Sequence, residues 1–196
     1  MIKLTYMKKL FFFFCLLCST ILVNAQNKVN FKMQSDASLK SEDGKDYIVV
    51  PFAGKSSQEL FSMVNINVTT QYVSAKNVLS SVENEVISIN GVGEGKIEKE
   101  KKTNAHFKQR QPVSPENTSY SFTFQYVLNF RFKDGKIRID APVIIGYSDS
   151  KEINDPIVLW VKRKGVDKEK VYKEIESILN ELCDKLISEK KVEEDW

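Results

Sequence analysis

The sequence is poor in the side chains that hold metals, with one histidine and three cysteines among 196 residues. A structural zinc site needs four ligands, mostly cysteine and histidine. Cys15 and Cys18 lie in an apolar N-terminal stretch that gives them no metal or redox context, which leaves His106 and Cys183. Two such residues are too few for a zinc site, and one cysteine cannot form an intramolecular disulfide. We therefore expect no metal, no cofactor and a fold held by its core.

Recognisable catalytic constellations are lacking as well. His106 stands in the charged segment 102–110, whereas a nucleophile–histidine device needs a histidine held by a third group. Gly91–Lys96 lacks the spacing and the helix of a phosphate-binding loop, so we expect bulges or a tight bend there. Asp134 is expected in a turn, and Asp140 beside an Arg or Lys of a neighbouring strand. No catalytic residue is predicted, and a hydrolase with two carboxylates stays open as an alternative.

The chain has no excess charge once its N-terminal segment is set aside. The net charge of +3 equals the charge of Lys3, Lys8 and Lys9, and residues 26–196 hold 26 basic and 26 acidic side chains. Binding of nucleic acid by phosphate neutralisation requires clustered positive charge. The neutral composition therefore predicts no nucleic-acid partner.

Residues 1–25 have the pattern of a secretory signal peptide. Three lysines precede the uncharged stretch Leu10–Val23, and Val23-Asn24-Ala25 is a small-residue cleavage pattern. Cleavage is expected between Ala25 and Gln26. The apolar stretch is shorter than the ~20 residues of a membrane span, so no integral span is expected after cleavage.

A lipid anchor is an alternative for this segment. Bacterial lipoproteins are acylated on a cysteine that follows a small residue, but Cys18 follows Leu17. The anchor is therefore disfavoured. We expect an exported protein of the periplasm or cell envelope, or a secreted one.

The remainder of the chain has the length of one domain. Residues 26–45 are polar and are expected to form a flexible lead-in. A single α+β domain is expected over 46–190, with a polar insert at 96–119 whose charges and prolines indicate a loop. The acidic end, 191–196, is expected to fray.

The strongest structural pattern is a β-hairpin in residues 120–147. Even-numbered residues up to Phe132 are apolar, and after Asp134-Gly135 the apolar positions become odd-numbered. Asp-Gly between alternating runs is typical of a two-residue hairpin turn. The predicted partners are Phe132 with Ile137, Phe130 with Ile139, Leu128 with Ala141, and Tyr126 with Val143. Both strands then turn an apolar face to the same side of the sheet.

One helix is predicted before the hairpin in the sequence and another after it. Ser56 and Glu59 form a capping box that starts a helix after a strand at 46–52. Residues 167–190 repeat apolar side chains at helical spacing, with Lys and Glu opposite and Cys183 at the margin of the stripe. Further strands are expected at 78–82 and 85–92. The result is an α+β fold of order β-α-β-β-β-β-α, an antiparallel sheet covered on one face by helices.

The aromatic face of the hairpin is a candidate binding site. If the C-terminal helix stands off the sheet, this face would line a cavity for a small apolar ligand. If the helix packs down, the same side chains form the core, which is the default use of such a face. The residues of this candidate ligand face are Phe122, Phe124, Tyr126, Phe130, Val143 and Ile145.

Several short motifs resemble a family of exported Bacteroidetes proteins, a domain of unknown function with a fold like the TATA-binding protein (TBP-like). They are the signal peptide, Phe52-Ala53-Gly54-Lys55-Ser56, Gly91-Val92-Gly93 and the hairpin segment 133–138. The resemblance covers residues 45–150 and departs from the family in the insert before Tyr120. It implies a TBP-like fold and a periplasmic or envelope setting. It brings no catalytic residue, and DNA binding does not follow from the fold.

These observations favour an uncharacterised exported protein that acts as a non-catalytic binding or accessory domain. Its expected partner is an envelope protein. A carrier or sensor of an apolar ligand, held between the sheet and the C-terminal helix, is the second interpretation. The two differ in whether a cavity lies beneath that helix.

Overall fold

The computed structural model describes residues 28–72, 74–98, 119–148 and 167–189. The expected signal peptide, its cleavage site, Cys18, His106 and the segment 191–196 lie outside the described residues. In the described part of the chain, no helix is both long and apolar enough to cross a membrane.

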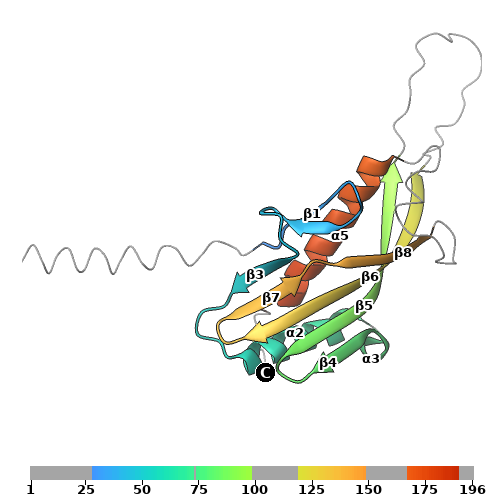
Figure 1. Cartoon of the computed structure of the whole chain (residues 1–196). Coiled ribbons are helices and arrows are strands. Elements are labelled where there is room, and N and C mark those ends of the chain that lie inside the picture. Colours follow the sequence, from blue (N-terminus) through green and yellow to red (C-terminus); the bar gives the residue numbers. More distant parts are fainter. Residues whose placement is uncertain (1–27, 73, 99–118, 149–166, 190–196) are drawn as a thin grey trace, which may run out of the picture.

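The fold is an antiparallel sheet of six strands with a separate two-stranded ribbon (Figure 1). The elements are β1 (Phe31–Met33), β2 (Leu39–Ser41), β3 (Tyr47–Pro51), α2 (Ser57–Gln71), α3 (Ala75–Val78), β4 (Leu79–Val82), β5 (Val86–Glu98), β6 (Ser119–Lys133), β7 (Lys136–Asp140), β8 (Val143–Ser148) and α5 (Lys168–Ile187). The sheet order is β3-β7-β6-β5-β4, and β8 pairs with β6. The α+β class and the antiparallel sheet are as predicted, while the order gains β1, β2 and α3, and the last predicted strand is divided into β7 and β8.

Helices α2 and α5 lie together on one face of the sheet, where the core is formed (Figure 1). Even-numbered residues of β6 and odd-numbered residues of β7 point into it, as their alternation predicts. The apolar stripe of α5 is buried from Val171 to Leu186. Burial of these faces is the main stabilisation of a chain without an intramolecular disulfide.

The start of α2 is fixed by the predicted capping box. The Ser56 backbone N–H donates to Glu59 Oε2 at 2.8 Å, and the Glu59 N–H donates to Ser56 Oγ at 3.3 Å. The bond from the Ser56 backbone N–H, together with one from the Ser56 hydroxyl to the same oxygen, lowers the pKa of the exposed Glu59 carboxyl. Asp134 of the β6–β7 turn accepts a further bond from the Ser57 N–H at 2.8 Å. The turn and the helix start are therefore held together.

The hairpin register is confirmed near the turn and wrong beyond it. Phe132 pairs with Ile137 and Phe130 with Ile139, as predicted. The predicted partners of Ala141 and Val143 are incorrect, because Pro142 has no N–H and ends the pairing of β7 with β6. Pairing resumes one residue out of step in β8, with Val127 opposite Val143 and Tyr126 opposite Ile144.

The flexible lead-in predicted at 26–45 is wrong for residues 28–45. Strands β1 and β2 form an antiparallel ribbon, and Val29, Phe31 and Leu39 are buried in the core. The ribbon packs against α5, which lies about 140 residues later in the sequence. With Ala37, four apolar side chains of this polar stretch are buried, and their spacing gives no periodic signal.

The outer edge of β1 is hydrogen-bonded by side chains of α5 instead of by a strand. The backbone N–H groups of Val29, Phe31 and Met33 donate to Asp184, Asn180 and Glu176 respectively, each at 2.8 Å. Asn180 Nδ2 also donates to the Phe31 carbonyl at 3.0 Å. Residues four apart lie on the same face of a helix. In a strand, the backbone N–H groups of alternate residues point to the same edge. The two periodicities match over this short contact.

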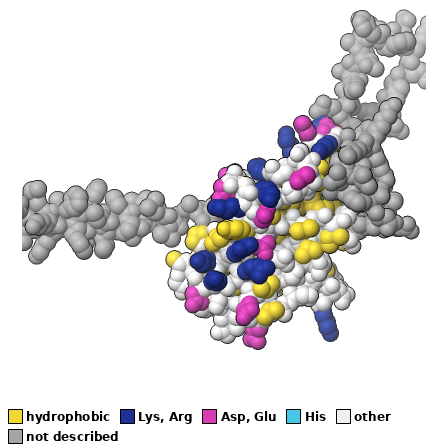
Figure 2. Space-filling model, viewed as in Figure 1, with side chains coloured by type: hydrophobic (Ala, Val, Ile, Leu, Met, Phe, Trp, Pro, Cys, Tyr) yellow, Lys and Arg dark blue, Asp and Glu magenta, His cyan; other side chains and the backbone are white. Residues whose placement is uncertain are grey.

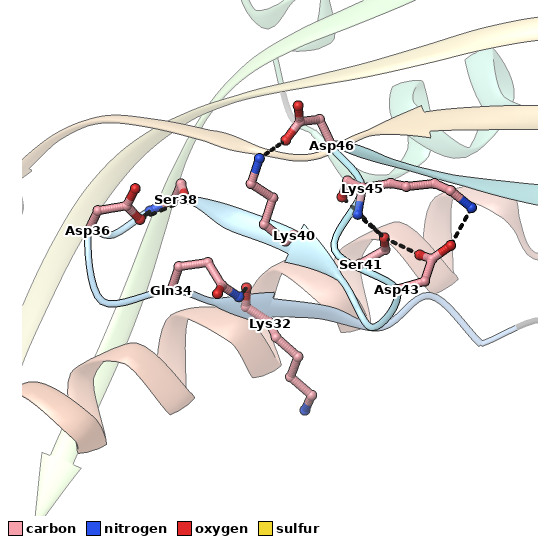
Figure 3. Close-up of polar contacts among 9 residues, drawn as sticks. All are labelled: Lys32, Gln34, Asp36, Ser38, Lys40, Ser41, Asp43, Lys45 and Asp46. Atoms are coloured by element: carbon pink, nitrogen blue, oxygen red, sulfur yellow. Dashed lines mark hydrogen bonds and ion pairs between the residues drawn. The ribbon is translucent and has the colours of Figure 1, made fainter.

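Polar side chains fix the turns at both ends of β2 (Figure 3). The Ser38 N–H donates to Asp36 Oδ1 at 3.0 Å, and the Lys45 N–H donates to Ser41 Oγ at 3.0 Å. The bond from the Ser38 backbone lowers the pKa of Asp36. These Asx-type bonds explain why a sequence rich in Ser, Asp and Lys is ordered here.

Strand β5 is longer than predicted and has no bulge. It pairs with β6 in continuous register from Val86 to Glu98, so the polar insert begins after β5 and not at residue 96. Gly91, Gly93 and Gly95 lie directly opposite Tyr126, Phe124 and Phe122. Each aromatic ring lies over its glycine, and an added Cβ would be 2.3 Å from the ring. The glycines are therefore required by the close approach of the rings.

Cys183 of α5 is fully buried. Its position at the margin of the apolar stripe suggested a less buried side chain. Burial raises the pKa of its thiol well above the ordinary value, so the thiolate is disfavoured at neutral pH. We expect iodoacetamide to modify Cys183 at least about a hundredfold more slowly in the native protein than in urea. Mass spectrometry of the Cys183 peptide measures this directly. Equal rates in both conditions would contradict the burial.

Candidate binding face

The sheet face opposite α2 and α5, called the open face, carries the exposed side chains of the strands. Alternation places odd-numbered residues of β6 and even-numbered residues of β5 and β7 on it. Figure 2 shows this face, with Lys and Arg side chains gathered over β7 and hydrophobic side chains nearby. Four of its apolar residues are about half exposed: Val49, Val82, Val92 and Val143.

The β6–β7 end of the open face concentrates positive charge. Arg131 lies directly opposite Arg138, and Lys133 lies directly opposite Lys136. Like charges in such cross-strand pairs are destabilising. We call these four residues the basic end. Their like-charge pairs lower the stability of the hairpin, and features that cost stability are expected at functional sites.

Asp140 neutralises part of this charge. Its carboxylate accepts from Arg131 Nε at 2.9 Å and from Arg138 Nε at 2.7 Å, which confirms the expected pairing with a neighbouring strand. Asp140 is largely covered, whereas both arginine side chains are about half exposed. Among the described residues Lys133 and Lys136 form no ion pair. With Asp140 paired to the arginines and Glu85 nearby, two carboxylates stand against four cations, so the basic end stays positive.

Aromatic and aliphatic groups lie between the charges. The guanidinium of Arg138 lies over the ring of Tyr47, 4.1 Å from its centroid, in a cation–π contact. An open hollow of about 690 Å³ occupies this region. It is lined by Tyr47, Val49, Glu85, Val86, Arg131, Phe132, Lys133, Lys136 and Arg138. The hollow thus combines fixed cations with apolar surface.

A second open hollow of about 540 Å³ adjoins the first and shares Arg138 with it. Its lining is more apolar, with Ala141, Pro142 and Val143 from the end of the hairpin. Asp36 and Asp46 contribute acidic groups. The open face thus has two adjoining hollows, one lined by the basic end and the other mainly apolar with a few acidic groups.

The candidate aromatic ligand face is not assembled as predicted. Phe122, Phe124 and Phe130 are fully buried in the core, and Tyr126 lies close to them. Val143 and Ile145 are 59% and 57% exposed, so they do not belong to this face. The one-residue shift at β8 turns Val143 to the other side, and Ile145 is the extra residue of a bulge.

A small hollow of about 240 Å³ lies between the sheet and α5. It is the part of the structure where the apolar-ligand interpretation can be located. Tyr126 and Tyr72 line it, and their hydroxyl oxygens are 2.7 Å apart. Burial raises the pKa of both tyrosines, so both stay neutral. Of the predicted ligand face, Tyr126 alone lines this hollow.

The two aspartates singled out in the sequence, Asp134 and Asp140, both have structural partners in the described part of the chain. Asp134 caps α2, and Asp140 is engaged by two arginines. Over the same residues, no three His, Cys, Asp or Glu side chains group as metal ligands. Gly91–Lys96 is continuous strand and not a loop. Asp134 and Asp140 thus serve the helix start and the charge balance of the hairpin.

The sequence analysis does not predict the basic end, because net charge is summed over the whole chain and hides a local cluster of cations. The hairpin sequence Arg131-Phe132-Lys133-Asp134-Gly135-Lys136-Ile137-Arg138 places a cation at every polar position beside the turn. The predicted register already paired those positions, since Phe132 pairs with Ile137. Local charge patterning along the hairpin would therefore have indicated the site.

Two solved structures are similar to this chain. One is a TBP-like protein from Parabacteroides distasonis ATCC 8503, at 12% identity and a TM-score of 0.45, covering 74% of this chain and 92% of that chain. The other is a DUF4468 family protein from Bacteroides ovatus ATCC 8483, at 14% identity and a TM-score of 0.44, covering 86% of this chain and 97% of that chain. No family model and no curated protein matches the sequence.

Proposed function

We propose that the chain is an exported, non-catalytic binding domain of the cell envelope, and that the basic end of its open face binds an acidic segment of a protein partner. The observation that carries the proposal is the two cross-strand pairs of like charge, Arg131 opposite Arg138 and Lys133 opposite Lys136. Asp140 bridges the arginines, whereas the lysine pair has no ion-pair partner among the described residues. A carboxylate-bearing ligand would relieve the repulsion that these pairs create. Export rests on the signal pattern of residues 1–25.

A protein segment fits this surface better than nucleic acid does. The charge is confined to one end of the face, and Glu85 and Asp140 lie beside it. A phosphate backbone would need a longer track of cations. Tyr47 and Val49 offer apolar contacts of the kind that peptide side chains use. The favoured ligand is therefore a peptide that combines carboxylates with apolar residues.

The apolar-ligand interpretation has weaker support. Its aromatic face is largely solid core, and the hollow beneath α5 has about a third of the volume of the basic hollow. Lys185 and Glu181 form an ion pair across one helical turn at its margin. The basic end is the more specific feature.

The test uses a fluorescein-labelled hexaglutamate peptide, with binding followed by anisotropy in low salt. The protein is expected to bind hexaglutamate and not hexaglutamine, and added salt should weaken the complex. The double variant Lys133→Gln/Lys136→Gln is expected to lose about tenfold in affinity, since each exposed charge contributes about 0.5–1 kcal/mol.

The matched control removes the same charge elsewhere. Lys76 and Lys173 are exposed on helices α3 and α5, away from the open face. Lys76→Gln/Lys173→Gln should leave hexaglutamate binding within about twofold of the parent. Equal losses in both double variants would contradict a specific site. Binding of duplex DNA but not of hexaglutamate would also overturn the proposal.

A further inference from the structure

We propose that the acidic segment that follows α5, Glu193-Glu194-Asp195-Trp196, docks in the same chain on the basic end and competes with external ligands. This inference rests on the proposed function of the open face. It names a regulator of that site rather than a new site. Three features of the described residues support it. The end of α5 is anchored, it adjoins the β6–β7 turn, and the cations of the basic end flank that turn.

The end of α5 is held in place. Asn67, a buried polar residue of α2, donates from Nδ2 to the carbonyls of Leu186 and Ser188, at 2.9 Å each. Glu189 forms an ion pair with Lys55, with Nζ and Oε1 3.2 Å apart. The following segment therefore starts from a defined point beside Lys55.

That point adjoins the hairpin turn that carries the basic end. The Gly135 N–H donates to the Lys55 carbonyl at 2.8 Å, and the Phe52 N–H donates to the Gly135 carbonyl at 2.7 Å. Lys133 and Lys136 flank this turn and lie opposite each other. The end of α5 is thus connected by direct contacts to the tip of β6 and β7.

The segment is long enough to pass around this tip. Residues 190–196 follow Glu189, and an extended chain spans about 3.3 Å per residue. Glu193 can then lie up to about 13 Å from Glu189 and Asp195 up to about 20 Å. Stacked sheets lie about 10 Å apart and packed helices about 8–10 Å apart, so one layer of this fold is crossed in a distance of that order. The three acids therefore have sufficient reach to contact the open face.

The charges and the aromatic group are complementary. In the sequence, Lys190 and Lys191 follow α5 first, and the three consecutive acids come after them, which leaves the negative charge at the end of the segment that can reach farthest from α5. Asp140 is the one acid in ion-pair contact with the basic end among the described residues, and it serves only the two arginines. The segment would supply carboxylates to Lys133 and Lys136. Trp196 would meet a surface that already holds a cation–π contact, Arg138 on Tyr47.

Docking within one chain has a quantitative consequence. A short tether gives a local concentration in the millimolar range, so even a weak contact is substantially occupied. A free acidic peptide then binds more weakly to the whole chain than to a chain without the acids. The partner must displace the segment.

The first measurement uses Trp196 as a reporter. Trp160→Phe leaves it as the single tryptophan of the protein. We expect its acrylamide quenching to be about threefold slower than that of a free tryptophan amide at low salt, and this protection to be lost in high salt. Adding Lys133→Glu/Lys136→Glu should abolish the protection, whereas adding Lys76→Glu/Lys173→Glu should keep it. Quenching equal to the free amide, or equal in both charge variants, would overturn the docking.

The second measurement separates this inference from the proposed function. Glu193→Gln/Glu194→Gln/Asp195→Gln is expected to bind labelled hexaglutamate about three- to tenfold more tightly than the parent chain. If affinity is unchanged but hexaglutamate still binds, the docking is refuted and the binding face stands. If neither chain binds hexaglutamate, both proposals fail. Trp196 protection that rises with protein concentration refutes docking within one chain.

Discussion

Replacement of Gly93 by valine is expected to lower the free energy of unfolding by about 3 kcal/mol or more, at the upper end of what overpacking of a core costs. A Cβ at this position would lie 2.3 Å from the Cζ atom of Phe124 and 2.6 Å from another ring atom. Phe124 is fully buried, and the rings of Phe122 and Tyr126 stand on either side of it, with centroids 6.2 and 5.9 Å away. The two flanking rings restrict how far the Phe124 ring can shift away from an added side chain.

The neighbouring positions of β5 provide the control. Val92 is exposed on the opposite face, so Val92→Ala should change stability by less than about 0.5 kcal/mol. A smaller side chain opposite the glycine should relieve the clash, so Gly93→Val is expected to cost less in a Phe124→Leu background than alone. Urea unfolding followed by far-UV circular dichroism measures each difference. Additive effects of Gly93→Val and Phe124→Leu would contradict the proposed contact.

The row of glycines illustrates what the sequence can and cannot predict. The alternation in β6 fixed which of its faces is buried, and Asp134-Gly135 fixed the register with β7, because both signals are local. The register of β6 with β5 crosses residues 99–118 and has no short turn to set it. Without that register, the glycines could not be placed opposite the rings. From the sequence alone, they therefore predict bulges or a tight bend.

The error at β8 has a comparable origin. Apolar residues occupy every odd-numbered position from Ile137 to Tyr147 in the sequence, and Ile144, apolar at an even-numbered position, is the one hydrophobic departure from that alternation. Pro142 was the available signal, because it cannot donate a bond within a sheet. Its effect is to separate β7 from β8 and to turn Val143 outward. Two residues of the predicted ligand face were lost in this way.

The basic end shows the opposite situation, since its pairing could be predicted and its charge was overlooked. The register that correctly paired Phe132 with Ile137 also implies that Lys133 lies opposite Lys136 and Arg131 opposite Arg138. Net charge is a property of the whole chain, whereas a binding site depends on the few cations within a Debye length of about 10 Å. The apolar groups between the charges required the fold, because Tyr47 arrives from β3.

Phe31→Ala is expected to lower the free energy of unfolding by about 3–5 kcal/mol, the range for removal of a buried phenylalanine side chain. Phe31 is fully buried between β2 and α5, although its segment reads as polar and loose in the sequence. Truncation leaves a cavity and also weakens the apolar contact of β1 with the helix. If residues 28–45 were a flexible lead-in, the same change would have no effect.

Two further variants distinguish a cavity in the core from a general sensitivity of the ribbon. Lys32 is about half exposed, and its ion pair with Glu176 is 3.5 Å long, so Lys32→Ala should change stability by at most about 0.5 kcal/mol. Asn180→Leu removes the acceptor of the Phe31 N–H and the donor to its carbonyl, at an expected cost of about 1–3 kcal/mol for each buried group left unpaired. Urea unfolding that left Asn180→Leu as stable as Lys32→Ala would show that α5 does not hold the edge of β1. A large loss for Asn180→Leu would instead mean that a helix completes this ribbon as a third strand would, through side chains spaced four residues apart.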